Sequence, residues 1–154
     1  MSENNLYRRE ELPGFVINQA AKSITDLLHQ NFKLANQDVT PEQWIILDEL
    51  WRHDGLSQLE IARATFRNQT STSRILDNLV KRDLLYRSQD PQDKRSNLIY
   101  LTTKGKGLQE TLIRIVKQTM ADVVNEIDED DLTKCMQVLN KMTANTIKKS
   151  MIDL

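Results

Sequence analysis

Hydrogen-bonding side chains gather on one face of a predicted helix in the middle of the chain. A capping Asn68 and apolar positions at three- and four-residue steps predict that this helix runs to about Lys81. The outward face near its start carries Gln69, Thr70, Ser71, Ser73 and Arg74. Such side chains can bond base edges in the DNA major groove, where Arg pairs with guanine, Gln with adenine, and Thr touches the thymine methyl group. By itself a polar helix face is a weak signal, because most surface helices have one.

A second group of charged side chains lies in the polar segment 89–97. Predicted strands at 84–88 and 98–101 flank this segment, which therefore forms the tip of a hairpin. The tip carries Asp90, Asp93, Lys94 and Arg95. An arginine in this position can enter the narrow, electronegative minor groove, and Asp90 or Asp93 can orient its guanidinium through an ion pair. A solvated turn without a binding role explains the spacing equally well.

Short helices with clear starts precede these two groups. Thr40-Pro41-Glu42-Gln43 and Ser57-Gln58-Leu59-Glu60 are capping boxes, which predict helices that end near Gly55 and Ala64. The helix that follows Asn68 turns inward Ile75, Leu76, Leu79 and Val80. Three short helices followed by a hairpin are typical of a winged helix-turn-helix, in which the third helix enters the major groove. We therefore predict a mainly α protein with a small β-hairpin wing.

Longer amphipathic helices flank this core, at 15–35, at 104–127 and after the acidic run 128–131. Their apolar stripes are wide, and a core of about 65 residues has too little surface to cover them all. We therefore expect a homodimer, with an N-terminal tail and dimerisation helix at 1–39, a DNA-binding domain at 40–104 and C-terminal dimerisation helices at 105–154. Two-fold symmetry then predicts a palindromic operator.

Composition and charge limit the class of protein. The net charge of the chain is −1, but ten Lys and Arg against six Asp and Glu between Arg52 and Lys104 give that stretch +4. Such a basic centre with acidic flanks fits one binding module. The start of the chain has no apolar run of the kind found in a signal peptide, and Cys135 is the only cysteine. We therefore expect a cytoplasmic protein without disulfide bonds.

Several of these segments together resemble the MarR family of bacterial transcription regulators. The hairpin sequence, from Arg87 through Asp90 and Asp93 to Arg95 and on to Leu101-Thr102-Thr103-Lys104-Gly105, is similar to the wing of that family. The helix starts at Thr40 and Leu59 and the segment 71–79 are similar to other parts of it. Asp83 stands where the family often has glycine, and Asp tolerates the left-handed conformation that a helix end needs there. The segment 66–68 is unusual for the family.

The resemblance implies a homodimeric repressor of transcription that a small ligand, often aromatic, releases from DNA. His29, Phe32, Trp44 and Trp51 are the residues that we expect to line the ligand cleft. Trp44 and Trp51 also have ordinary core spacing, seven positions apart on one helix, and for His29 a surface or core position is the stronger interpretation.

Other classes of protein fit less well. The sequence has no nucleophile–histidine pattern, no phosphate-binding glycine loop and no cluster of metal ligands, so we expect no enzyme, cofactor or metal. A winged helix that binds proteins as an adaptor, without specific DNA binding, is the alternative.

Overall fold

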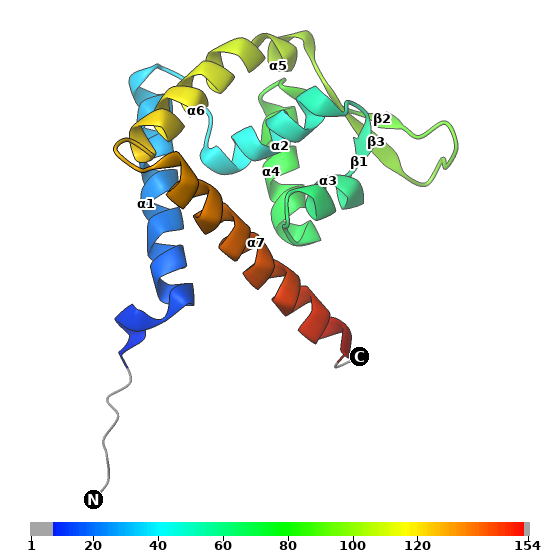
Figure 1. The fold of residues 1–154 in the computed structure, drawn as a ribbon. Coiled ribbons are helices and arrows are strands. Elements are labelled where there is room, and N and C mark those ends of the chain that lie inside the picture. The colour runs from blue at the N-terminus through cyan, green and yellow to red at the C-terminus, as the bar shows by residue number, and fades with distance from the viewer. Residues whose placement is uncertain (1–7, 153–154) are drawn as a thin grey trace, which may run out of the picture. The chain divides into compact units, whose positions relative to one another are not determined.

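The computed structural model describes residues 8–152, which are mainly helical (Figure 1). A short turn of 3-10 helix at Arg9–Glu11 precedes the first long helix. The elements then follow in the order α1 (Pro13–Leu34), α2 (Pro41–Arg52), β1 (Leu56–Ser57), α3 (Gln58–Ala64), α4 (Gln69–Lys81), β2 (Leu85–Gln89), β3 (Asn97–Leu101), α5 (Thr103–Gly107), α6 (Gln109–Val123) and α7 (Glu129–Ile152). The chain divides after Thr119 into two compact units, of which the first contains α1 to α5 and most of α6. No helix among residues 8–152 combines the length and apolarity that a membrane span requires.

The predicted helix starts of the core are confirmed by their hydrogen bonds. Thr40 Oγ1 accepts from Gln43 N at 3.3 Å, while Gln43 Oε1 accepts from Thr40 N at 3.1 Å. Ser57 and Glu60 form the same reciprocal pair at the start of α3. Asn68 Oδ1 accepts from Ser71 N at 2.7 Å and begins α4. Each cap satisfies backbone N–H groups that have no partner inside the helix, and so fixes where the helix begins.

The ends of α1, α3 and α4 share one geometry. The residue beyond each cap has a positive φ: 55° at Asn36, 54° at Phe66 and 58° at Asp83. In each case its N–H and that of the next residue bond back to carbonyls of the last turn, as in a Schellman motif. The left-handed conformation expected of Asp83 is thus confirmed.

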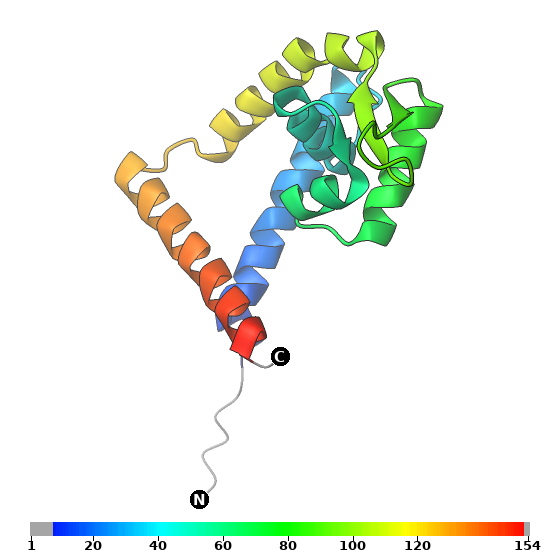
Figure 2. The same ribbon diagram turned by 90° about the vertical axis from the view of Figure 1, so that its right-hand side faces the viewer.

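The three strands form one antiparallel sheet in the order β1-β3-β2. In the wing hairpin, Leu85 pairs with Leu101 and Arg87 pairs with Ile99. Tyr86 and Tyr100 stack on this sheet with ring centroids 5.5 Å apart. The third strand, β1, was not predicted, because two residues are too few to show an alternating pattern. Figure 2 shows the molecule from the side toward which this hairpin extends in Figure 1.

One hydrophobic core lies beneath this sheet and between the helices of the first unit. Its fully buried members include Phe32, Ile46, Leu47, Leu50, Ile61, Leu76, Leu79, Leu84, Leu85, Ile99 and Leu112. The predicted inward positions of α4 are thereby confirmed for Leu76 and Leu79, while Ile75 and Val80 are half-buried against the core. Thr72 is also fully buried, and its hydroxyl donates to Asn68 O at 2.9 Å. The core tolerates this buried threonine because the bond satisfies its hydroxyl group.

The helix predicted at 104–127 is interrupted in the structure, and that prediction was wrong in detail. Two glycines, Gly105 and Gly107, weaken the helix before Leu108, where α5 ends and α6 follows. Leu108 keeps right-handed helical angles, so the chain direction continues. The second part ends at Val123 rather than at 127, and the turn that follows contains Glu126 with φ 61°.

Candidate nucleic-acid interface

The start of α4 presents the polar side chains that the sequence predicts for contact with DNA. Gln69, Thr70 and Arg74 are exposed, while Ser71 and Ser73 are half-buried. Asn68 differs from the others because its Oδ1 is engaged in capping the helix. Gln58 Nε2 donates to Gln69 O at 3.4 Å, so α3 contacts the first turn of α4.

A hydrogen-bonded network holds the opposite end of α4. Arg82, at the C-terminal cap, donates to Gln43 Oε1 at 3.0 Å and to the carbonyl oxygen of Asp38. Its guanidinium also lies 3.1 Å from the Asp38 carboxylate. Gln43 Nε2 in turn donates to Asn78 Oδ1 at 2.8 Å. The segment between α1 and α2 and the first turn of α2 thus fix the last turns of α4, independently of the apolar packing beneath it.

A hollow of about 590 Å³ lies between the start of α2 and the exposed face of α4. Its lining includes Glu42, Gln43, Arg67 and Arg74. The Nε atom of Arg67 is buried and has no hydrogen-bond partner among the described residues. A buried donor without a partner is energetically costly.

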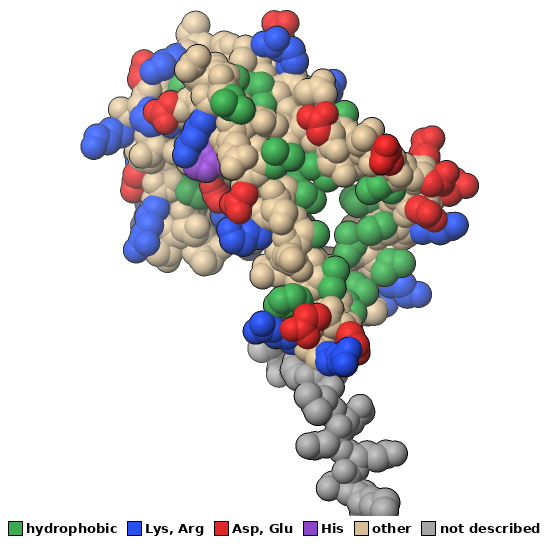
Figure 3. Space-filling model, turned by 90° about the vertical axis from the view of Figure 1, so that its left-hand side faces the viewer, with side chains coloured by type: hydrophobic (Ala, Val, Ile, Leu, Met, Phe, Trp, Pro, Cys, Tyr) green, Lys and Arg blue, Asp and Glu red, His purple; other side chains and the backbone are tan. Residues whose placement is uncertain are grey.

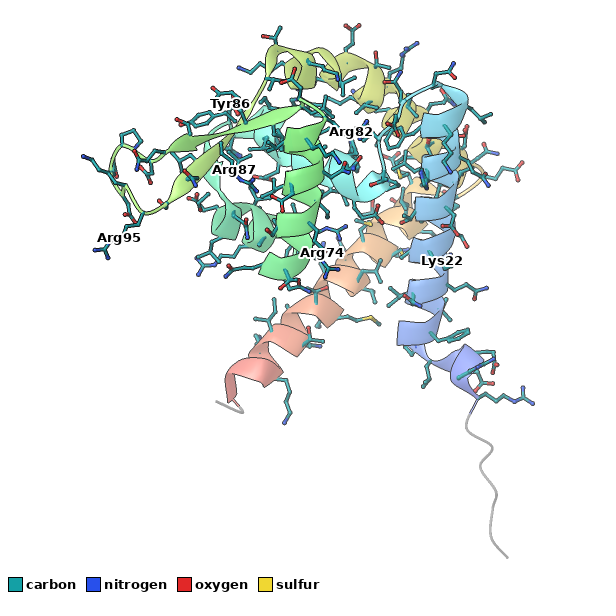
Figure 4. All side chains as sticks on the ribbon, turned by 180° about the vertical axis from the view of Figure 1, so that it is seen from behind. Lys22, Arg74, Arg82, Tyr86, Arg87 and Arg95 are labelled. Carbon is teal, nitrogen blue, oxygen red and sulfur yellow. The ribbon has the colours of Figure 1, made fainter. Side chains whose placement is uncertain are left out.

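The acidic side chains of the wing stabilise its loop and do not orient the Arg95 guanidinium. Asp93 Oδ1 accepts from Arg95 N at 2.9 Å, and Asp90 Oδ1 accepts from Gln92 N at 2.8 Å. Within residues 8–149, no ion pair joins the Arg95 guanidinium to either carboxylate, so the predicted orienting pair was wrong. Short polar side chains in turns bond to nearby backbone N–H groups in preference to distant partners. Figure 4 shows Arg95 at the tip of the hairpin, pointing away from the rest of the molecule.

Lys94 is the second exposed cation of this tip. Its carbonyl oxygen accepts from Gln89 Nε2 at 2.7 Å, which braces the loop across the hairpin. The predicted wing residues Asp93, Lys94 and Arg95 therefore lie together in one ordered loop. The predicted major-groove residues lie together on α4.

One contact between these two groups was not anticipated. Arg87 on β2 donates from Nη2 to Asp77 Oδ1 on α4 at 2.6 Å (Figure 4). Arg87 belongs to the wing sequence described above, but only the fold shows that it faces Asp77. The alternation of side chains along β2 was the available signal, because it places Arg87 and Leu85 on the same face of the strand.

Glu60 is the one described group with a resolved pKa change. Hydrogen bonds from Ser57 N and Ser57 Oγ, at 2.8 and 2.7 Å, lower the pKa of the Glu60 carboxyl from its ordinary value of 4.5. Burial and the nearby Asp90 act in the opposite direction, and Arg63 lowers the pKa further. This carboxylate therefore serves the start of α3, and its charge stabilises the helix N-terminus.

The four residues predicted for a ligand cleft lie in different surroundings. Phe32 has no exposed surface and belongs to the core, and Trp51 Nε1 donates to Gly105 O at 3.1 Å. His29 lines a hollow of about 270 Å³ together with the segment 36–40, and none of the other three residues lines that hollow. Trp44 is half-buried against the core, and its indole N–H is buried without a hydrogen-bond partner in the described part of the chain.

Comparisons with known proteins agree with this arrangement. Residues 39–96 match the model of the MarR family. The chain is 26% identical over 140 residues to the HTH-type transcriptional repressor NicR of Pseudomonas putida, which covers 91% of this chain and 87% of NicR.

Solved structures show the same fold. BpsR of Bordetella bronchiseptica superimposes with a TM-score of 0.82 at 23% identity, over 89% of this chain and 96% of that one. A cysteine-to-serine variant of MarR from E. coli, complexed with operator DNA, superimposes with a TM-score of 0.79 at 23% identity, over 86% of this chain and 95% of that one. Residues 39–96 of the chain therefore match the MarR family of transcription regulators, and the chain has the fold of the solved MarR structure.

Proposed function

We propose that this chain is a homodimeric repressor that binds a palindromic operator with α4 in the major groove and the wing in the minor groove. The proposal rests on one observation. Polar side chains are exposed on α4 and at the tip of the wing, and hydrogen bonds hold both elements in place. The α4 contacts are assigned to Asn68, Gln69, Thr70, Ser71, Ser73 and Arg74, and the wing contacts to Asp93, Lys94 and Arg95. In this assignment Asn68 and Asp93 act by shaping the backbone, since the structure engages their carbonyl or carboxylate oxygens in local bonds.

The second copy is inferred from apolar side chains that nothing covers within their own compact unit. In the first unit, the start of α1 and the residue that precedes it expose Leu12, Phe15, Val16 and Ile17. In the second unit, α7 exposes Met136, Val138, Met142 and Ile147, and Cys135 is exposed on the same helix. Figure 3 shows such hydrophobic side chains open at the surface. Exposed apolar stripes of this length mark a protein interface, and a self-complementary one gives a two-fold dimer.

A small aromatic acid is proposed as the signal that releases DNA. Support comes from BpsR, whose regulation of DNA binding by 6-hydroxynicotinic acid is described with its structure. In this chain, the unpartnered indole N–H of Trp44 is a buried donor that a ligand carboxylate or carbonyl would satisfy. We place this activity in the cytoplasm, together with the DNA.

Selection from a random duplex library tests the DNA assignment. The expected product is an inverted repeat, bound by two copies, with an affinity that falls as salt rises because bound phosphates release counterions. Sedimentation velocity gives the oligomeric state of the free protein and of the complex. Failure to bind any duplex at low salt would remove the regulator proposal and favour the adaptor alternative.

The ligand assignment is tested separately by calorimetry with 6-hydroxynicotinic acid. Trp44→Phe keeps a similar shape but removes the indole N–H, so it is expected to weaken binding while leaving operator affinity in the absence of ligand unchanged. Equal binding by both proteins would exclude Trp44 as the donor.

A further inference from the structure

Phe66 occupies the turn between α3 and α4 in a backbone conformation that its side chain disfavours. Its φ is 54°, and its N–H bonds to Arg63 O at 3.2 Å while that of Arg67 bonds to Ala62 O at 2.9 Å. Glycine is the usual residue at this position of a Schellman motif, with asparagine next, because a bulky Cβ crowds the backbone there. The matching positions after α1 and α4 hold Asn36 and Asp83, which are residues that tolerate it.

The side chain of Phe66 also gains nothing from the fold. It is 87% exposed, the most exposed of the large hydrophobic side chains among the described residues. An exposed aromatic ring forgoes the burial that normally makes phenylalanine favourable. The two costs fall on one residue, so the stability of the fold does not explain a phenylalanine here.

The position of Phe66 points to the partner that covers it. Phe66 lies two residues before Asn68, which caps the proposed recognition helix. It follows Arg63 in the last turn of α3, and it directly precedes Arg67, which lines the hollow beside Arg74. Arg63 and Arg67, which stand close to Phe66 in the chain, favour a polyanion as the partner, since phosphates would neutralise them as the ring is covered.

We propose that the Phe66 ring packs against apolar C–H surface of the bound operator at the edge of the major groove that α4 enters. Thymine methyl groups and deoxyribose rings both present such a surface, and aromatic side chains contact thymine methyl groups in known modes of readout. This inference rests on the proposed function and adds to it one apolar contact beside the polar ones. Backbone strain at a surface turn is then tolerated because it directs the ring toward DNA.

Substitution at Phe66 is expected to affect the stability of the fold and operator binding differently. Phe66→Asn should leave the melting temperature unchanged or raise it, because asparagine accepts a positive φ more readily. The same substitution should weaken operator binding about tenfold, the loss expected for half of an aromatic side chain's burial. Phe66→Leu keeps an apolar side chain and should retain most of the affinity. Because none of these changes alters charge, the dependence of affinity on salt should keep its slope.

Two kinds of duplex identify the apolar group. If the ring contacts a thymine methyl, replacing that thymine by uracil weakens operator binding by the wild-type protein but not by Phe66→Asn. If no such replacement matters while Phe66→Asn remains weaker, deoxyribose is the contact.

One comparison distinguishes this inference from the proposed function. Suppose that Phe66→Asn binds the operator with wild-type affinity while Arg74→Ala loses binding. That result would overturn the inference and leave the DNA assignment standing. If the wild-type protein binds no duplex at low salt, both fall together.

Discussion

The guanidinium of Arg87 on β2 donates to the carboxylate of Asp77 on α4 at 2.6 Å, and so joins the wing directly to α4. The Asp77 side chain is 60% exposed and the Arg87 side chain 33%, so the pair is only partly screened by solvent. An ion pair of this exposure contributes less than about 1 kcal/mol to folding. We therefore look for its role in geometry, because it joins two proposed DNA-reading elements.

Asp77→Asn separates positioning from simple electrostatics. Removing a negative charge beside DNA should by itself tighten binding, because the protein surface becomes more basic. If the ion pair positions the wing, the substitution instead weakens operator binding several-fold, while the unfolding free energy changes by less than about 1 kcal/mol. Fluorescence anisotropy with the selected operator and thermal unfolding measure the two effects. Tighter binding by Asp77→Asn would show that the wing does not depend on this pair.

Arg95 and Arg74 are expected to differ in what their removal changes. Arg95→Ala should weaken binding to all sequences and reduce the salt dependence, because it removes a contact to the minor groove and its phosphates. Arg74→Ala and Ser73→Ala should also change which bases are preferred, each contact being worth about 1–3 kcal/mol of discrimination.

Lys22→Ala is the matched control for this comparison. Lys22 is an exposed cation on α1 that pairs with Asp26 at 2.8 Å, far along the helix from the winged part (Figure 4). Its removal should leave operator affinity unchanged. Repeating the library selection with each variant reads the base preference, and identical selected motifs for wild type and Arg74→Ala would show that α4 is placed wrongly.

Two neighbouring glycines should respond oppositely to alanine. A Cβ at Gly105 would lie 2.2 Å from Leu84 O, so Gly105→Ala must displace backbone and is expected to cost about 1–3 kcal/mol. A Cβ at Gly107 meets nothing within 4 Å, and Gly107→Ala should stabilise the helix by about 0.5–1 kcal/mol. Urea unfolding followed by circular dichroism gives both values. Equal effects at the two positions would contradict the close approach of α5 to Leu84.

Glu60 gives the protein a pH dependence on the acid side. Because the Ser57 hydrogen bonds lower its pKa in the folded state, its contribution is present above the ordinary value of 4.5 and is lost as pH falls through the lowered pKa. Glu60→Gln retains the shape of the capping box but not the charge, so it should flatten this part of the stability curve. The effect is a few tenths of a kcal/mol, because the carboxylate is exposed. A curve for Glu60→Gln that falls as steeply as that of the wild type would assign the acid sensitivity to other carboxyls.

Local features of the fold could be predicted from the sequence, and contacts between distant residues could not. The caps at Thr40, Ser57 and Asn68 depend on residues three positions apart, and the left-handed Asp83 depends only on its place after α4. The Asp77–Arg87 pair depends on the angle at which β2 crosses α4, which no spacing encodes. Arg95 shows the same limit, since the carboxylates near it bond to the backbone instead.

The hydrogen bonds of Arg82 hold the end of α4 in place, and they also connect α4 to the segment that follows α1. They join the end of α4, which we propose reads DNA, to the segment that directly follows α1, the helix proposed for dimerisation. We expect these bonds to transmit a small rotation of α1 to α4. In the proposed dimer, Asp38 and Arg82 are therefore expected to influence the distance between the two copies of α4 without touching DNA.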